Sequence, residues 1–438
     1  MDVSSAKAIV RKVLWRVLPF VMLLLLFNLI DRTNISVAAL QLNTDLGLTP
    51  TAYGLAAGIF FIGYFLFEIP SNLMLVRVGA RPWLARIMIS WGAIVICMAW
   101  MSGVRSFYAL RFLLGVAEAG LLPGVLLYLS YWIPGARLGL AYSLLMATTA
   151  IANTVSGPIA AGLMQLDGAF GLRGWQLMFV AEGIPTIVVG LAVARYLPER
   201  PSGARWLSAE ERKWLDMTIE REEQEKRLHG ATSFAQGFFD RRVLLATLTC
   251  FLFVCCNFGT VFWLPQIIHS FGRLNTLQVG FLSSIPYLLG GAATILWGRH
   301  SDITGERKWH LLAGALLGAA GYISATLAHT AVGTLVALCV ATIGIWSLFG
   351  VFWAYVGNFL GGAAAAGGFA LVNSFGTLGG FVGPVTVGFI RERTHSFSGG
   401  LLALAGFALL TAITVLFIEA KATHAVARSA REATRDYV

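Results

Sequence analysis

Charged residues are scarce in this sequence. Asp, Glu, Lys and Arg make up 12% of its 438 residues, and hydrophobic residues make up 57%, whereas a soluble domain carries roughly 25% charged residues. This shortage excludes an ordinary soluble fold. Apolar runs such as 17–29, 87–101 and 311–328 recur along the chain. A helix needs about 20 mostly apolar residues to cross a bilayer, and its backbone must satisfy its own hydrogen bonds there, so the runs predict membrane-spanning helices.

Cysteine is also rare, and the motifs of common cofactors are missing. The five cysteines all lie within apolar runs and show no metal-binding spacing: Cys97, Cys250, Cys255, Cys256 and Cys339. We therefore expect small buried side chains there and neither a metal site nor a disulfide. The sequence has no nucleotide-binding loop and no nucleophile–base arrangement. We expect no cofactor and no enzymatic activity.

The net charge of +10 does not indicate a nucleic-acid partner, because the basic residues are dispersed among short loops. If the chain crosses the membrane twelve times, 25 of the 32 Lys and Arg residues fall on the side of the two termini and five on the other side. The positive-inside rule then predicts that both termini are cytoplasmic. We expect a multi-pass protein of the cell inner membrane, surrounded by lipid and monomeric.

The predicted fold class is an all-α membrane protein with two six-helix bundles. The twelve apolar segments are 14–40, 52–76, 83–103, 106–132, 138–166, 174–197, 243–270, 276–298, 309–328, 331–357, 366–391 and 397–418. The expected domains are an N-terminal bundle (1–197), a cytoplasmic linker with an amphipathic helix (198–242), a C-terminal bundle (243–418) and a cytoplasmic tail (419–438). In the linker, Ser208 and Glu211 form a capping-box pattern, which predicts a charged helix that ends near Leu228.

The two halves of the sequence resemble each other. Residues 76–83 (VRVGARPW) align with 302–309 (DITGERKW) at an offset of 226 residues, and the same offset places Gly157-Pro158 on Gly383-Pro384. Two landmarks at one offset indicate duplication of a six-helix unit. Parallel repeats of this kind place the substrate site between the halves, near the middle of the membrane.

Four motifs make the sequence resemble the anion:cation symporter family of the major facilitator superfamily. They are residues 28–35 (NLIDRTNI), 111–119 (RFLLGVAEA), 297–302 (WGRHSD) with 305–307 (GER), and 370–374 (ALVNS). The resemblance spans the whole chain and implies the major facilitator fold and proton-driven uptake of small organic anions. Two positions depart from the family pattern: Leu29 replaces a usual tyrosine, and Val76 replaces a usual acidic residue.

Four ionisable residues lie within predicted spans of the N-terminal half: Asp31, Arg32, Arg111 and Glu118. Each charge in a spanning helix costs at least about 2.5–3.5 kcal/mol on insertion scales. The 226-residue offset leads to uncharged residues from all four, with Asn257 as the counterpart of Asp31. A purely architectural role would have kept the charges in both halves. Their asymmetry favours a functional role.

We predict that Arg32 anchors a substrate carboxylate, because a guanidinium matches a carboxylate with two parallel hydrogen bonds. The alternative is a structural ion pair with Asp31 or with another span. The resemblance supports the anchor, since the equivalent arginine of the family is a substrate ligand.

Asp31 and Glu118 are the predicted proton carriers, with Arg111 as their partner. Burial favours the protonated form of a carboxyl group and a nearby arginine favours the ionised form, so a site whose burial changes during transport can load and release protons. The alternative is permanent pairing with Arg111, which lies seven residues before Glu118 on the same helical face. For Glu68 and Glu182, which precede prolines, we expect a structural role.

The resemblance also implies residues that line the substrate site and residues of the loop motif. The predicted lining residues are Tyr64, Thr149, Trp353 and Asn373; for Tyr64 and Trp353, placement at the membrane interface is the alternative. The conformational loop motif comprises Arg77, Gly79 and Arg81 in the first half and Asp302, Gly305 and Arg307 in the second.

Two other functions compete with proton-coupled symport of an organic anion. The first is a proton-coupled exporter of a drug or metabolite, which Gly157-Pro158 in the fifth span keeps open. The second is a transporter-like sensor, which the absence of a recognisable output domain disfavours.

Overall fold

The computed structural model describes residues 3–229, 240–272, 274–359 and 362–418. Within these ranges all regular secondary structure is helical. The helices are α1 (Val3–Asp45), α2 (Pro50–Val78), α3 (Ala80–Met98), α4 (Val104–Glu118), α5 (Leu121–Ser130), α6 (Gly135–Met164), η1 (Ala169–Gly171), α7 (Gly174–Tyr196), η2 (Pro201–Gly203), α8 (Ala209–His229), α9 (Arg241–His269), α10 (Thr276–Thr304), α11 (Lys308–Leu327), α12 (Ala331–Phe359), α13 (Gly362–Thr377), α14 (Gly379–Thr394) and α15 (Ser398–Leu416).

Twelve spans in the described part of the chain are long and apolar enough to cross a membrane, which confirms the predicted number. The fourth span consists of α4 and α5, and the eleventh contains parts of α13 and α14. The apolar runs of the sequence predict both spans as continuous helices. Both breaks occur near glycines, at Gly120 and at Gly379-Gly380.

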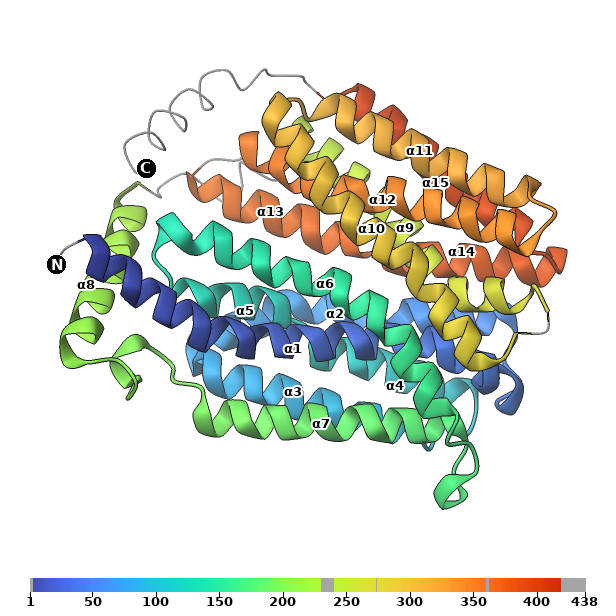
Figure 1. Cartoon of the computed structure of the whole chain (residues 1–438), viewed down its shortest axis with the longest axis horizontal. Helices are drawn as coiled ribbons and strands as arrows, with labels where there is room; N and C mark the ends of the chain where they lie inside the picture. Colours follow the sequence, from blue (N-terminus) through green and yellow to red (C-terminus); the bar gives the residue numbers. More distant parts are fainter. Residues whose placement is uncertain (1–2, 230–239, 273, 360–361, 419–438) are drawn as a thin grey trace.

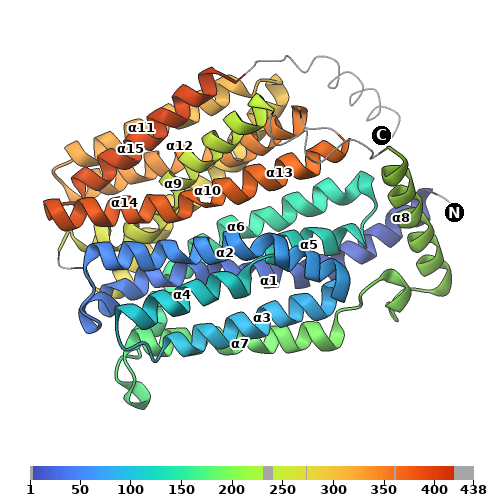
Figure 2. The same cartoon turned by 180° about the vertical axis from the view of Figure 1, so that it is seen from behind.

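The spans form two bundles that lie side by side, α1–α7 in one and α9–α15 in the other (Figures 1 and 2). Three helix pairs carry most of the contact between the bundles: α2 with α14, α6 with α10 and α1 with α9. The two bundles of six spans predicted from the duplication are therefore present.

The contacts between the bundles gather at the end of the molecule away from the chain termini. Near the α1–α2 connection, the Thr51 backbone N–H donates to Glu392 at 2.8 Å and the Tyr53 hydroxyl donates to the Phe262 carbonyl at 2.9 Å. A Cβ added to Gly54 would lie 2.7 Å from the Pro384 carbonyl oxygen. Glycine is needed there because the backbones of α2 and α14 are nearly in contact. The two bundles are thus closed against each other at this end.

Helix α8 lies outside the two bundles, beside the beginning of α1 (Figures 1 and 2). Its capping box forms as predicted: the Ser208 backbone N–H donates to Glu211, and the Glu211 N–H donates to the Ser208 hydroxyl. Lys12 of α1 also donates to Glu211 at 2.8 Å, and this bond holds the pKa of Glu211 below its usual range. The charged helix thereby contacts the N-terminal bundle. Residues 230–239 of the predicted linker and the predicted tail, 419–438, lie outside the described residues.

Candidate functional site

An ion pair between Arg32 of α1 and Glu118 of α4 forms the centre of the site. Arg32 Nη2 lies 3.0 Å from Glu118 Oε2, and Asn28 donates to the same oxygen at 2.7 Å. Asn28 precedes Arg32 by one helical turn, so both side chains approach Glu118 from the same face of α1. The Glu118 side chain is fully buried, whereas 15% of the Arg32 side chain is exposed. The arginine is therefore the more accessible member of the pair.

Two aromatic rings of α2 flank the Arg32 guanidinium. Its central carbon lies 5.0 Å from the Phe60 ring centroid and 5.3 Å from that of Tyr64. Ring faces attract cations and restrict the movement of the side chain. Arg32 Nε is buried without a hydrogen-bond partner among the described residues. The guanidinium thus keeps donor capacity that Glu118 does not use.

A break in the fourth span fixes the position of Glu118. Helix α4 ends at Glu118, and Gly120 follows with a φ of +86°. Only glycine adopts this left-handed conformation at little cost. A Cβ at Gly120 would also lie 2.5 Å from the Ser71 hydroxyl oxygen. The end of α4 therefore delivers a carboxylate into the interior of the N-terminal bundle.

Arg111 forms no ion pair with a described carboxylate in this conformation, so its predicted pairing stays a prediction. Arg111 is fully buried, and it donates to the carbonyl oxygens of Ala56 and Ala57 on α2, both at 3.2 Å. Its guanidinium also lies 5.0 Å from the Phe60 ring centroid. Spacing along α4 predicted one face for Arg111 and Glu118, but Glu118 points to α1 instead. Arg111 thus joins α4 to α2 in this conformation.

Asp31 and Glu182 lie at a second contact, between α1 and α7. Thr186 donates to Asp31 Oδ2 at 3.2 Å, and Asn34 donates to Glu182 Oε2. Asp31 is 1% exposed and Glu182 is 5% exposed. The position of Glu182 three residues before Pro185 predicts a structural role near that proline. Its partner is instead a polar side chain of the span that carries Arg32.

The predicted lining residues are only partly brought together. Tyr64 lies beside Arg32, whereas Trp353 of α12 stacks on Phe369 of α13 at a centroid distance of 5.8 Å. Thr149 lies on α6, where its carbonyl accepts a hydrogen bond from Asn153. Trp353 and Thr149 make no hydrogen bond or ring contact with the ion pair among the described residues in this conformation, so their role in binding stays a prediction.

Asn373 links the two bundles through Glu68. Asn373 of α13 donates to Glu68 Oε1 at 2.9 Å, and Ser374 donates to Oε2 at 2.8 Å. The position of Glu68 two residues before Pro70 predicts a structural role near that proline. Glu68 instead accepts two bonds from the opposite bundle, which places a buried carboxyl group across the interface near Tyr64.

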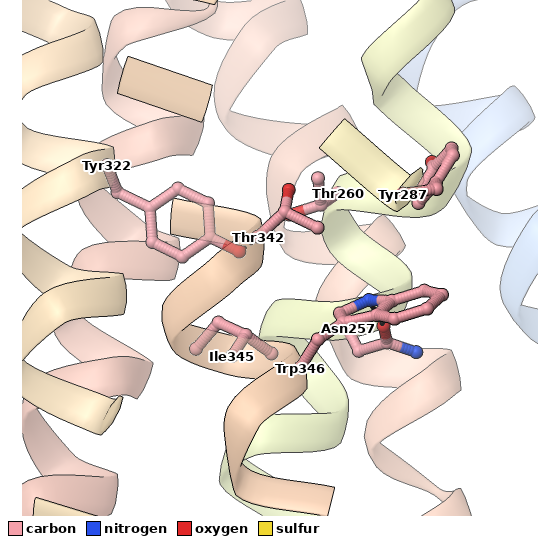
Figure 3. Close-up of a pocket in the computed structure, with 7 residues that line it drawn as sticks. All are labelled: Asn257, Thr260, Tyr287, Tyr322, Thr342, Ile345 and Trp346. Carbon is pink, nitrogen blue, oxygen red and sulfur yellow. Dashed lines mark hydrogen bonds between the residues drawn. The ribbon is translucent and has the colours of Figure 1, made fainter. Parts of the chain in front are cut away.

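The C-terminal bundle has a neutral polar pocket where the N-terminal bundle has charges. The pocket is small and is lined by Asn257, Thr260, Tyr287, Tyr322, Thr342, Ile345 and Trp346 (Figure 3). Trp346 Nε1 donates to Asn257 Oδ1 at 3.0 Å, and the Thr260 and Tyr322 hydroxyls are 2.6 Å apart. Asn257 is the repeat counterpart of Asp31. The charge asymmetry seen in the sequence thus corresponds to two chemically different bundles.

The loop motifs make contacts within their own bundles. Glu199 accepts hydrogen bonds from the backbone N–H groups of Ala80, at 2.6 Å, and Arg81, at 2.9 Å, after Gly79 with its φ of +102°. In the second copy, Arg307 pairs with Asp302 at 2.5 Å. Glu199 thus supplies a carboxylate to a loop whose usual acidic residue is replaced by Val76.

Sequence reasoning missed the roles of Asn28, Asn34 and Thr186. Each is an uncharged polar residue that donates to a buried carboxyl group. Spacing offered one signal: Asn28 lies four residues before Arg32, and Asn34 lies three residues after Asp31. Polar residues at these intervals share a helical face with the charges.

The comparisons with known proteins agree with this fold. A family model described as Major Facilitator Superfamily matches residues 21–384. The chain belongs to the major facilitator superfamily, as its motifs predicted. It is therefore a secondary transporter and a multi-pass membrane protein rather than an enzyme.

Two relatives and one solved structure are similar to this chain over most of its length. A protein of Agrobacterium vitis named "Putative tartrate transporter" is 46% identical over 418 residues, 95% of this chain and 96% of that protein. The "Quinolone resistance transporter" of Acinetobacter baumannii is 40% identical over 415 residues, with 95% and 96% coverage. The partially occluded, inward-open xylose transporter XylE of E. coli superimposes with a TM-score of 0.75 at 16% identity, covering 94% of this chain and 99% of XylE. At that identity the superposition supports the fold alone.

Proposed function

We propose that the protein is a proton-coupled symporter that brings a small organic carboxylate into the cell by alternating access. The observation that carries this proposal is the Arg32–Glu118 pair. Arg32 is a partly exposed cation whose partner is a buried carboxyl group. A substrate carboxylate and Glu118 therefore compete for the same guanidinium.

This competition supplies a coupling mechanism. Ionised Glu118 satisfies Arg32 and opposes substrate binding. Protonation of Glu118 removes its charge and leaves Arg32 in need of an anion, because an unpaired buried charge is costly. A substrate carboxylate then binds the guanidinium. After the substrate leaves on the other side, Glu118 releases its proton and pairs with Arg32 again.

The state of the interface fits one step of this cycle. The bundles are closed against each other at the α1–α2 end. The excess of Lys and Arg residues on the side of the chain termini supports a cytoplasmic location for that side and an external location for the α1–α2 end. We assign the structure to a state closed to the outside, in which Glu118 is ionised and pairs with Arg32.

For the substrate class, we infer a small carboxylic acid, with tartrate as the first compound to test. The relative from Agrobacterium vitis carries tartrate in its name. Arg32 can bind one carboxylate, and the uncharged hydroxyl, amide and indole groups of the C-terminal bundle suit the neutral part of a hydroxy acid. Thr149, a small side chain, favours a less hydroxylated compound than a sugar acid.

Export of a drug is the second candidate, and the quinolone resistance transporter favours it. Quinolones carry a carboxyl group, so Arg32 serves both functions. The direction of coupling separates the two candidates. A symporter accumulates substrate on the side that is more alkaline, whereas a proton-coupled exporter accumulates it on the side that is more acidic.

The experiment that tests the proposal is uptake into proteoliposomes containing the purified full-length chain, with a panel of radiolabelled carboxylic acids and an imposed pH gradient. We expect a carboxylate to concentrate in vesicles with an alkaline interior, accompanied by proton entry. A quinolone in the same panel tests export. The symport proposal is wrong if no carboxylate accumulates in this direction.

A further inference from the structure

We propose that Asp31 and Glu182 form a carboxyl pair that holds a shared proton, which makes Glu182 a further proton-coupling residue. The inference rests on the proposed symport, and it adds a second proton site beside Glu118. It starts from the arrangement of four side chains on two facing helices. On α1, Asp31 and Asn34 are one helical turn apart, as are Glu182 and Thr186 on α7.

The hydrogen bonds cross between these two faces. Asn34 of α1 donates to Glu182 of α7, and Thr186 of α7 donates to Asp31 of α1 at 3.2 Å. Thr186 also reaches back to the Glu182 carbonyl at 3.0 Å. Each carboxyl group therefore receives one neutral donor from the opposite helix. This pattern brings the two acids into one local environment.

Each acid keeps an oxygen without a partner. Asp31 Oδ1, Glu182 Oε1 and the amide oxygen of Asn34 are buried and make no hydrogen bond to any described residue. Two ionised carboxylates with these unsatisfied oxygens would be costly in a water-poor interior. A proton bound by either acid supplies the missing donor. Two carboxyl groups that share a site characteristically hold one proton between them.

The charged residues of the surrounding helices either have other partners or lie near the beginning of their helix. From α4, Glu118 faces Arg32, and Arg111 donates to carbonyl oxygens of α2. The charged residues of α3 (Arg81 and Arg86) lie in its first two turns, and the one of α6 (Arg137) lies in its first turn. No described cation forms an ion pair with Asp31 or Glu182. A proton is therefore the cation that this pair can hold.

Tight packing encloses the pair on the side of α3. A Cβ at Gly183, next to Glu182, would lie 2.8 Å from the Gly92 carbonyl oxygen and 2.6 Å from Ile96 Cγ1. On the other side, Asp31 is adjacent in sequence to Arg32. The protonation state of the pair can thus act on the carboxylate anchor through one residue of α1. Loss of the shared proton would place an added negative charge beside Arg32 and weaken its attraction for substrate.

The direct test is titration of the carboxylic-acid C=O stretching band by infrared difference spectroscopy on the purified full-length chain. Interacting acids titrate in two separated steps that belong to the pair. In wild type, the last proton of the pair should leave at a pH at least about one unit higher than the pH at which the remaining acid of Asp31→Asn or of Glu182→Gln loses its proton. Each variant lacks the neighbouring carboxyl group that interacts with the remaining acid. This titration step should be absent from the double variant with Asp31→Asn and Glu182→Gln. Glu182→Asp keeps a carboxyl group and should therefore retain part of the upward shift that Glu182→Gln loses.

Controls distinguish a shared proton from a structural role. Glu182→Gln keeps an acceptor for Asn34, so local packing should survive. Asp45→Asn makes the same acid-to-amide change at the far end of α1, where Asp45 accepts from Trp175, and its titration should match wild type. If the remaining acid of each single variant titrates as it does in wild type, the two groups do not share a proton and the inference is wrong.

A second arm measures protons moved per substrate in proteoliposomes. Glu182→Gln should lower this ratio relative to wild type and to Asp45→Asn. An unchanged ratio would overturn the coupling role of Glu182. If wild type itself moves no protons, the proposed symport fails, and the infrared titration still decides whether the pair holds a proton.

Discussion

Replacing Arg32 by alanine should weaken binding of a carboxylate substrate by at least about tenfold, or about 1.4 kcal/mol. A hydrogen bond to a charged group contributes about 1.5–3 kcal/mol, and Arg32 is positioned to make such bonds because 15% of its side chain is exposed. Part of this gain is offset in wild type, because the substrate must displace Glu118 from a 3.0 Å contact. The lower end of the range is therefore the expected minimum.

The lysine variant separates charge from geometry. Arg32→Lys keeps the positive charge but loses the planar pair of donors. We expect its affinity to lie between that of wild type and that of Arg32→Ala. The assay is equilibrium binding of radiolabelled substrate to purified protein, with Arg173→Ala as the control. Arg173 is 66% exposed, and its loss should leave affinity unchanged.

The alanine variant also leaves Glu118 buried without its cation, which costs about 3–5 kcal/mol if the group stays ionised. Arg32→Ala combined with Glu118→Gln removes both charges and should be the more stable protein. It should still bind substrate weakly, because the anchor is absent. Wild-type affinity in a well-folded Arg32→Ala or double variant would remove Arg32 from the site.

Three further predictions concern topology, the closed interface and the loop after α2. A cysteine at Ser202 should resist an impermeant thiol reagent added to intact cells, and rapid labelling would reverse the assigned orientation. Gly54→Leu should disfavour the closed state by about 1–3 kcal/mol, because the added side chain overpacks against Pro384, and it should slow uptake. Gly406→Leu is the control, because Gly406 has open space around it. Equal uptake by the two variants would contradict the assigned closure. Glu199→Ala should lower stability by roughly 1 kcal/mol, because two backbone N–H groups at the beginning of α3 lose their acceptor, and an unchanged thermal midpoint would refute this.

The number of spans and the duplication could be predicted because hydrocarbon imposes strict rules on the sequence. Apolar length and backbone satisfaction leave a helix as the only option for each long run. Helix ends were less predictable. The first span was expected at 14–40, but α1 extends from Val3 to Asp45, since a helix can continue into water beyond its apolar stretch. The breaks near Gly120 and Gly379-Gly380 were missed because glycine is frequent throughout these spans.

The partners of the intramembrane charges were harder to predict. Their presence in the N-terminal half was evident from the sequence, and burial of Asp31, Arg111 and Glu118 agrees with the cost of exposing them to lipid. Which side chain each one contacts depends on the rotation of one helix relative to another. Spacing along one helix favoured Arg111 as the partner of Glu118, but the interhelical geometry selected Arg32.

The partner of Glu182 illustrates the same limit. Its proximity to Pro185 in sequence suggested a local role, whereas the packing of α7 against α1 places it on Asn34. Such contacts join residues 148 positions apart. One sequence taken alone contains no signal that identifies them.

The pH dependence of substrate binding tests competition between Glu118 and substrate for Arg32 most directly. If substrate binds only when Glu118 is protonated, each binding event takes up one proton. The dissociation constant should then be flat at low pH and rise about tenfold per pH unit above the apparent pKa of the site. Glu118→Gln mimics the protonated state and should lose the pH dependence that Glu118 causes, so that it keeps the low-pH affinity of wild type until the Asp31–Glu182 pair releases its proton. A wild-type dissociation constant that does not change with pH, or a Glu118→Gln variant with the wild-type pH profile, would contradict the proposed coupling.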